Sequence, residues 1–381
     1  MRLRFGSTLC VLALGCVVSA AHAAEPDDLV YVLNSTKRIC QLTGDFDRAS
    51  KIPTLSQTGK RFGIDGTDLG SSFDQKGKLY FLFGDTVGRP GARDAVGWTT
   101  SKSPEHIVLD FFKERDGKWL PPTVPGISQG AFEVPSGGVS VGNEIYVAFT
   151  TDHTPKHTMG RSVMAVSRDD GRTWKALYDL SRDKFINVSM LVADGWLFIF
   201  GSGDYRKSTV SLARIRPEQI TQRSTLEYYA GEGADLQPNW SPREADAIPL
   251  FPNNQIGEFS VAYLEPVNRF VMLYNSGKPR GIVMRSSLLP RGPWSDGVVI
   301  FDPARDNGYG HFIHVPPSVS GKLDGLSDPG QTEKYGGVYG PYVIARYTNR
   351  IPGGCRIYYT MSTWNPYAVM VMQSDLRLAK P

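Results

Sequence analysis

Short apolar runs rich in Val, Ile, Tyr, Phe and Trp follow one another along most of the chain, and Gly, Pro, Asn or Asp separates them. Runs of this length and composition are typical of β-strands bounded by turns. The one helix-like stretch, residues 217–223, is short and polar. The pattern therefore predicts an all-β chain, with clear strands at 78–83, 144–149, 196–200, 270–274 and 356–360.

A repeated unit organises these strands. It has a glycine-led strand, an aromatic-rich strand, a strand with small hydroxyl residues and a closing strand before a turn. The unit recurs at spacings of roughly 50–70 residues, which suits a four-stranded propeller blade. We therefore expect a single-domain, five-bladed β-propeller over residues 63–381, with six blades as the alternative because 231–256 is unassigned. The expected inner strands begin near Gly66, Gly137, Asn187, Gly257 and Gly308.

Residues 167–174, in the second expected blade, read Ser-Arg-Asp-Asp-Gly-Arg-Thr-Trp. This segment resembles the Asp-box hairpin of sialidase-like propellers, in which Asp and Gly form the turn and Trp packs between strands. The motif is structural, so it supports the fold and says little about chemistry. Residues 24–62 precede the propeller, and 29–33 is a candidate strand for closing its ring.

The first 23 residues have the three parts of a secretory signal peptide. Arg2 and Arg4 supply the positive start, residues 9–18 the apolar stretch, and Ala-His-Ala at 21–23 the cleavage site. A lipoprotein would use Cys16, but Ala-Leu-Gly is a poor approach to it. We expect a secreted or periplasmic mature protein, because no other stretch is long and apolar enough to span a bilayer.

Net charge and cysteine count narrow the possible partners of the mature chain. The formal charge falls from +4 to about +2 without the signal peptide, and no run of like charges occurs, which argues against a nucleic-acid partner. Of four cysteines, only Cys40 and Cys355 remain after cleavage. A lone pair in an exported chain predicts one disulfide, which would tie the N-terminal segment to the last blade.

Three aspartates stand beside glycines at the ends of two strands in the first unit: Asp65, Asp68 and Asp85. Turns at strand ends aim side chains through rigid backbone, and a pair of carboxylates is what glycosidic bond cleavage needs. Asp65 also suits a turn that caps nearby amides, and Asp85 could close a hairpin. A carboxylate at Asp68 would be costly to bury on an inner strand without a partner, which favours a functional role.

Residues 66–70 read Gly-Thr-Asp-Leu-Gly, and residues 83–86 read Phe-Gly-Asp-Thr. This pair of motifs resembles the opening signature of the secreted DUF4185 group, whose members have been classed as endo-D-arabinanases, glycoside hydrolase family 183. Segments at 257–261, 292–295 and 357–367 follow the same family order, so the resemblance covers about 63–376. It implies that Asp68 and Asp85 form the catalytic pair.

Further candidate site residues come from the later inner strands and from other family-like segments. Glu258 is the reserve acid, since apolar neighbours favour the protonated form that a proton donor requires, although an ion pair with a basic residue is the alternative. Arg206 has a fork of donors for a sugar hydroxyl or for the acids, but Asp204 nearby departs from the family pattern. The expected substrate contacts are Asp65, Arg206, Asn275, His311 and Trp364.

Two histidine pairs, 153 with 157 and 311 with 314, suggest a metal site at first sight. Neither pair has the spacing of a zinc motif, and no cysteine or third ligand stands nearby in the sequence. We expect no catalytic metal and no cofactor, while a structural ion in the central channel stays open.

Together these features favour a secreted glycoside hydrolase that cleaves furanoside linkages through a carboxylate acid/base pair. Analogy with other five-bladed glycosidases leads us to expect inversion, which requires carboxyl groups about 6.5–9.5 Å apart. The resemblance implies endo action on D-arabinan, as in arabinogalactan or lipoarabinomannan, so the partner would be a polysaccharide. Two alternatives stay open: a lectin-like propeller that binds glycans without cutting them, and an exo-furanosidase of other specificity. The sequence does not indicate an oligomeric state.

Overall fold

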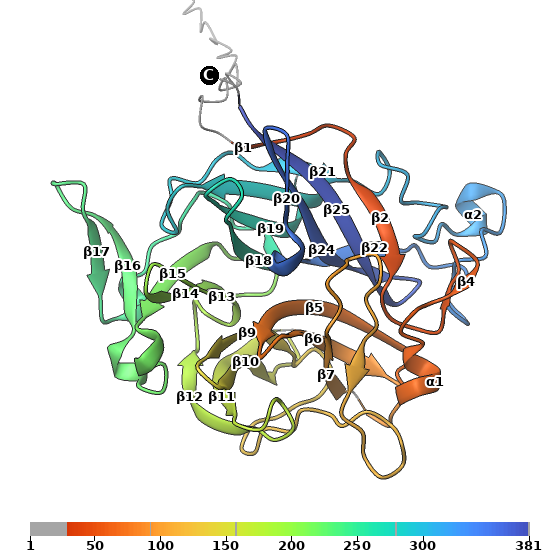
Figure 1. Ribbon diagram of the computed structural model, residues 1–381, viewed down its shortest axis with the longest axis horizontal. Helices are drawn as coiled ribbons and strands as arrows, with labels where there is room; N and C mark the ends of the chain where they lie inside the picture. Colours follow the sequence, from red (N-terminus) through yellow and green to blue (C-terminus); the bar gives the residue numbers. More distant parts are fainter. Residues whose placement is uncertain (1–28, 92, 157, 279, 380–381) are drawn as a thin grey trace, which may run out of the picture.

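The computed structural model describes residues 29–91, 93–156, 158–278 and 280–379. The expected signal peptide and His157 lie outside these residues. Five antiparallel blades surround one axis, which confirms the five-bladed β-propeller (Figure 1). Each inner strand contacts the next and the last contacts the first, in the order β5 (Gly66–Gln75), β9 (Pro135–Val141), β13 (Asn187–Ala193), β18 (Ile256–Leu264) and β22 (Gly337–Val343).

Antiparallel strands follow each inner strand outward. Blade 1 continues with β6 (Lys78–Val87), β7 (Arg93–Thr99) and β8 (Asp110–Phe111). Blade 2 continues with β10 (Glu144–His153), β11 (Met159–Ser167) and β12 (Lys175–Ser181). Blade 3 continues with β14 (Trp196–Ser202), β15 (Val210–Ile215), β16 (Glu227–Glu232) and β17 (Pro238–Ser241). Blade 4 adds β19 (Arg269–Gly277), β20 (Arg280–Ser287) and β21 (Val298–Phe301), and blade 5 adds β23 (Asn349–Ile351), β24 (Gly354–Trp364) and β25 (Ala368–Leu378).

The N-terminal segment completes the last blade. Strands β1 (Leu29–Tyr31) and β2 (Lys37–Gln41) both pair antiparallel with β25, with Leu29 opposite Leu378 and Lys37 opposite Gln373. The two ends of the described chain are thereby joined within one sheet, which holds the ring closed. The hairpin of β3 (Phe46–Asp47) and β4 (Ile52–Pro53), followed by α1 (Thr58–Phe62), leads from this edge into β5.

Packing between blades explains why the middle strands lack polar alternation. Every side chain of residues 79–83 in β6 is exposed by 1% or less. Phe81 and Phe83 belong to the core shared with blade 5, whereas Tyr80 and Leu82 belong to the core shared with blade 2. Burial of each such side chain contributes about 1.5–3 kcal/mol. A strand covered on both faces therefore reads as a continuous apolar run.

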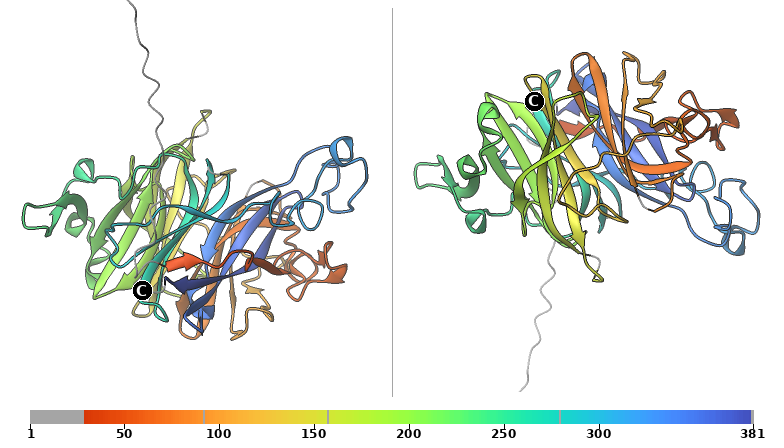
Figure 2. Two further views of the ribbon diagram at one scale, coloured as in Figure 1. Left: turned by 90° about the horizontal axis from the view of Figure 1, so that it is seen from above. Right: turned by 90° about the horizontal axis from the view of Figure 1, so that it is seen from below.

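One inner strand was predicted at the wrong place. Residues 308–314 form a turn closed by the hydrogen bond from the Gly310 amide to the Ile313 carbonyl, and the fifth inner strand is β22. The turn lies in a long connection that contains α2 (Pro317–Ser320). The unassigned stretch 231–256 holds part of the β16–β17 hairpin and adds no sixth blade. Figure 2 shows this hairpin and the α2 connection projecting from opposite edges of the wheel.

The Asp-box prediction is confirmed as a structural feature. The Asp169 carboxylate accepts hydrogen bonds from the Thr173 amide and hydroxyl and from the Ser167 hydroxyl. Trp174 is buried and packs edge-on against Phe149, with ring centroids 5.7 Å apart. The motif therefore stabilises blade 2.

The expected disulfide is wrong, because Cys40 and Cys355 are both free. Their strands flank β25, where Cys40 lies opposite Val371 and Cys355 opposite Leu376. These two β25 positions are separated by roughly 17 Å of extended strand, whereas a disulfide needs Cα atoms within about 7 Å. Burial raises the pKa of each thiol to about 12. Both thiols therefore stay protonated at neutral pH.

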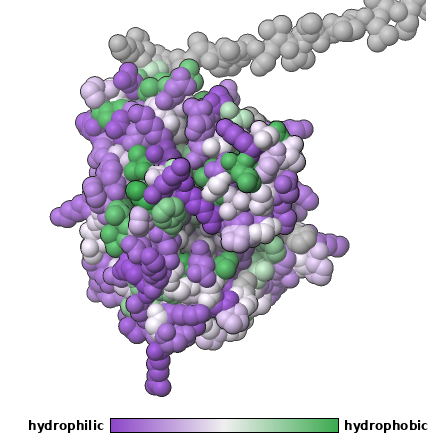
Figure 3. Space-filling model, turned by 90° about the vertical axis from the view of Figure 1, so that its right-hand side faces the viewer, coloured by the Kyte–Doolittle hydropathy of each residue, from purple (hydrophilic) through white to green (hydrophobic). Residues whose placement is uncertain are grey.

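The side of the molecule on which α2 lies has no continuous apolar surface among the described residues. Hydrophilic residues dominate this side, and apolar side chains form small separate patches (Figure 3). Within the described ranges, no helix is long and apolar enough to cross a membrane.

Candidate active site

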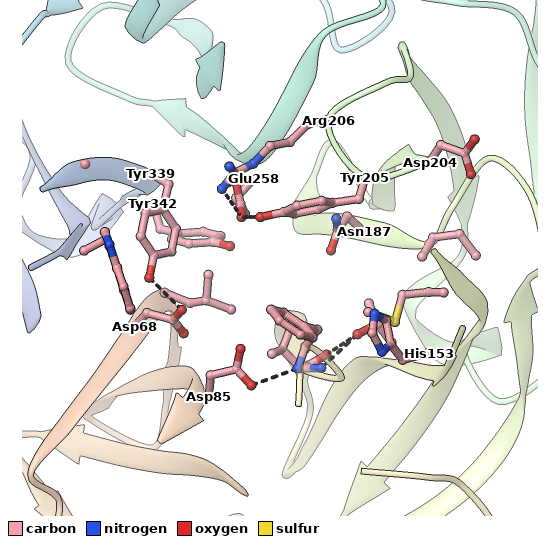
Figure 4. Close-up of a pocket in the computed structure, with 18 of the residues that line it drawn as sticks. Asp68, Asp85, His153, Asn187, Asp204, Tyr205, Arg206, Glu258, Tyr339 and Tyr342 are labelled. Carbon is pink, nitrogen blue, oxygen red and sulfur yellow. Dashed lines mark hydrogen bonds and ion pairs between the residues drawn. The ribbon is translucent and has the colours of Figure 1, made fainter. Parts of the chain in front are cut away.

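A cavity of about 610 Å³ opens at the central axis, and all five blades or their connections contribute side chains to it (Figure 4). Acids stand on two facing walls, with tyrosines and apolar rings between them. The lining includes Asp68, Asp85, Phe132, His153, Tyr205, Arg206, Glu258, Tyr339, Tyr342, Trp364 and Tyr367.

Asp68 is held on a distorted part of β5. The pairing of β5 with β6 shifts register on both sides of Asp68, and Leu69 has a left-handed backbone with φ of 64°. Bulges and strained residues of this kind re-aim side chains and cluster at functional sites. The Ser362 hydroxyl accepts the Leu69 amide at 2.7 Å, which holds the distortion in place. The Asp68 side chain thereby points into the cavity while only 7% of the residue is exposed.

The surroundings of Asp68 favour its protonated form. The Tyr339 hydroxyl donates to Oδ2 at 2.8 Å, and Oδ1 has no hydrogen-bond partner among the described residues. Burial, and next the charge of Asp85, raise the pKa of Asp68 to about 7, although the Tyr339 and Tyr367 hydroxyls act in the opposite direction. A large fraction of Asp68 therefore carries a proton near neutral pH.

Asp85 lies at the end of β6, beside Asp68 but nearer to solvent. Its Oδ1 accepts the Phe132 amide at 2.9 Å. Burial raises the pKa of Asp85, and the Phe132 amide and His153 oppose the rise. The preceding residue has to be glycine, because a Cβ on Gly84 would stand 2.6 Å from the Val134 side chain and 2.9 Å from the Asp68 carboxylate.

Glu258 occupies the facing wall, where β18 begins. Its Oε1 accepts the Tyr205 hydroxyl at 2.8 Å and lies 3.0 Å from the Arg206 guanidinium. The guanidinium also stacks over the Tyr205 ring at 4.6 Å. The predicted reserve acid is thus an ion-paired carboxylate, as the alternative interpretation of the sequence had it.

Residues 54–373 match the family described as Domain of unknown function (DUF4185). The chain belongs to the DUF4185 family. Notoamide biosynthesis cluster protein J of Aspergillus sp. (strain MF297-2) is 28% identical over 299 residues, which cover 68% of this chain and 77% of that protein. A provisionally named hydrolase from Bacteroides ovatus ATCC 8483 superposes with a TM-score of 0.54 at 12% identity, over 83% of this chain and 87% of that one. At that identity the likeness concerns the fold alone.

The structure brings five of the predicted site residues of this DUF4185 chain to the cavity: Asp68, Asp85, Arg206, Glu258 and Trp364. Their positions are set by blade ends that meet at the axis. Each was predicted from its place at the end of a strand or in a family-like segment.

Three predicted substrate contacts lie outside the residues that line the cavity. Asp65 is exposed before β5, where its amide donates to the Val87 carbonyl. Asn275 is buried in β19, and its Oδ1 accepts the Gly340 amide at 3.2 Å, so it joins blades 4 and 5. His311 is exposed in the turn that was mistaken for an inner strand.

Several cavity residues were not singled out from the sequence. Tyr339 was inaccessible to prediction because the fifth inner strand was expected elsewhere. Tyr205 directly precedes Arg206, and Tyr367 lies in the same family-like segment as Trp364. Their positions beside predicted site residues could have indicated both tyrosines. Phe132 lies in a connection without any recognisable motif. In the described part of the chain, no group of three or more His, Cys, Asp or Glu could hold a metal ion.

Proposed function

We propose that this DUF4185 protein is a glycoside hydrolase that cleaves furanoside linkages, endo-acting on D-arabinan. The observation that carries the proposal is a pair of neighbouring carboxyl groups with unlike surroundings in one cavity. Asp68 is buried with a pKa of about 7, and Asp85 is only partly buried near the end of β6. The resemblance of 66–70 and 83–86 to the signature of glycoside hydrolase family 183 supports the sugar class.

In the proposed reaction Asp68 is the general acid. Its proton passes to the glycosidic oxygen as the bond from that oxygen to the anomeric carbon breaks. Asp85 takes a proton from a water molecule, whose oxygen bonds to the anomeric carbon from the opposite side, with inversion. Solvent then returns a proton to Asp68 and removes one from Asp85. The products are two shorter glycans, and one water molecule is consumed.

The facing wall orients the substrate in this proposal. Arg206 keeps donor groups beside the cavity while Glu258 compensates its charge. A neutralised cation of this kind suits hydroxyl groups rather than an anionic sugar. The export signal expected at residues 1–23 would deliver the enzyme to a compartment that contains polysaccharide, so we propose a secreted or periplasmic location.

The test is incubation of the mature protein with arabinogalactan that contains D-arabinan, with Asp68→Asn as the control. We expect short oligosaccharides from the parent protein alone, and an inverted anomer in the first products by NMR. A retained anomer would exclude Asp85 as a base acting through water. Glycan binding without products from the parent would favour the lectin-like alternative, and release of single sugars from chain ends would favour an exo-furanosidase.

A further inference from the structure

Two of the exposed aromatic side chains that line the cavity lie on either side of the aspartates. Phe132 is 53% exposed and Trp364 is 43% exposed. Trp364 ends β24 in blade 5, and Phe132 precedes β9 in blade 2. In the ring, blade 1 lies between these two blades, because β5 contacts both β22 and β9. The carboxyl groups of blade 1 therefore have one aromatic ring on each side.

Phe132 forms a direct hydrogen bond with Asp85. Its amide donates to the carboxylate at 2.9 Å, and its backbone is left-handed with φ of 70°. The neighbouring Glu133 holds this connection in shape. Its carboxylate accepts the Ser128 hydroxyl at 2.6 Å, the Gly130 amide at 2.7 Å and the His153 amide at 2.8 Å. The left-handed turn presents the Phe132 ring to the cavity, 5.1 Å from the His153 ring.

Trp364 contacts the same aspartate indirectly, through Tyr367. Its ring packs edge-on against Tyr367, with centroids 6.0 Å apart. The Tyr367 hydroxyl donates to the Asp85 main-chain carbonyl at 2.9 Å. Both exposed rings are thus placed relative to Asp85 by rigid contacts, one through an amide and one through a phenol.

We infer that Phe132 and Trp364 are two sugar-stacking platforms on opposite sides of the bond that is cut. Sugar rings have an apolar face that packs on an aromatic ring while their hydroxyls stay hydrated. With a platform on each side, the substrate is a glycan chain with at least one sugar beyond the broken bond in either direction. This inference rests on the proposed hydrolase and names the residues that would hold the chain on each side of the bond, which the acid/base pair alone does not specify.

The experiment uses D-arabinan oligosaccharides with a fluorescent label at the reducing end. Loss of one stacking contact should raise KM about tenfold and change kcat much less. Phe132→Ala and Trp364→Ala should also move the preferred cut in opposite directions along the labelled chain. Phe132→Trp should restore both KM and cut position, which a merely structural role of the residue would not predict.

Two further variants separate the ring from the backbone. Phe132→Asn keeps the amide and tolerates a left-handed backbone, so it should behave as Phe132→Ala does. Phe46→Ala is the matched control, because Phe46 is 49% exposed on β3 and does not line the cavity. It should leave KM, kcat and the cut position unchanged.

The possible outcomes separate this inference from the proposed function. Cleavage by the parent with unchanged cut positions in both platform variants would overturn the platforms and retain the hydrolase. Oligosaccharide binding without cleavage, weakened by Phe132→Ala, would overturn the hydrolase and retain a platform. A protein that neither binds nor cleaves the oligosaccharides would overturn both.

Discussion

Asp68 and Glu258 face each other across the cavity with equal burial, since each residue is 7% exposed. Glu258 has the Arg206 guanidinium 3.0 Å away and the Tyr205 hydroxyl 2.8 Å away. Asp68 has the Tyr339 hydroxyl at 2.8 Å, and no Lys or Arg of the described chain forms an ion pair with it. At the same degree of burial, the carboxyl group of Glu258 thus has a neighbouring cation, whereas that of Asp68 has only a hydroxyl partner among the described residues.

The difference shows how one cavity can hold two carboxyl groups for two purposes. A buried carboxylate is stable when a cation compensates it, whereas an uncompensated one takes up a proton instead. A proton donor requires the second situation, and a fixed, charged wall for hydroxyl binding suits the first. Burial alone therefore does not identify the general acid. The presence or absence of a neighbouring cation distinguishes the two carboxyl groups.

The sharpest test of this comparison replaces each acid by its amide. Asp68→Asn should lower kcat/KM by about 10²–10⁴, because general acid catalysis typically contributes that much. Glu258→Gln should lower it by about tenfold, as a change in substrate orientation does. Initial rates on D-arabinan measure both. The reverse order of effects would transfer the role of acid to Glu258.

The second test concerns stability. The proton on Asp68 favours the folded state; this contribution is complete below pH 3.8 and is lost as pH rises through about 7. Asp68→Asn removes the cost of the buried charge, so its gain in unfolding free energy should be about 1–4 kcal/mol at pH 8. Below about pH 4 the gain should vanish. Urea unfolding at both pH values measures it, and an equal effect at both would contradict the uncompensated charge.

The third test removes the cation from the facing wall. Arg206→Met leaves Glu258 buried without compensation, which should lower the unfolding free energy by about 1–2 kcal/mol, less than for a fully buried pair because Arg206 is partly exposed. The double variant with Glu258→Gln should recover most of the loss. Equal losses in the single and double variants would show that the ion pair is not coupled.

The smallest expected effect is a shift in the pH dependence of kcat/KM. Tyr339→Phe removes a hydrogen bond that favours the charged form of Asp68, so the pKa of Asp68 should rise further. The alkaline limb of kcat/KM should move upward by about 0.7 pH units, since one hydrogen bond contributes about 1 kcal/mol. Tyr342→Phe is the control, because Tyr342 lines the same cavity from the same strand without bonding Asp68. A downward shift would contradict the assignment of this limb to Asp68.

Much of this molecule is determined locally by its sequence. Apolar runs such as 79–83, bounded by turn residues, specify strands, and four of the five inner strands begin where the repeat places them. Glycines and acids at strand ends likewise predicted Asp68 and Asp85, because bulged strand ends are local features. The predicted position of the fifth inner strand was wrong because the glycine-led segment at 308–314 has the composition of a strand but folds as a turn.

Only the tertiary structure decided what each acid can do. Asp68 meets Tyr339, 271 positions later, and Glu258 meets Arg206, 52 positions earlier. The separation of Cys40 from Cys355 and the placement of Asn275 between blades depend on strand pairing in the same way. Protonation follows from burial and from the nearest charges, and closure of the ring brings those groups together from distant parts of the chain.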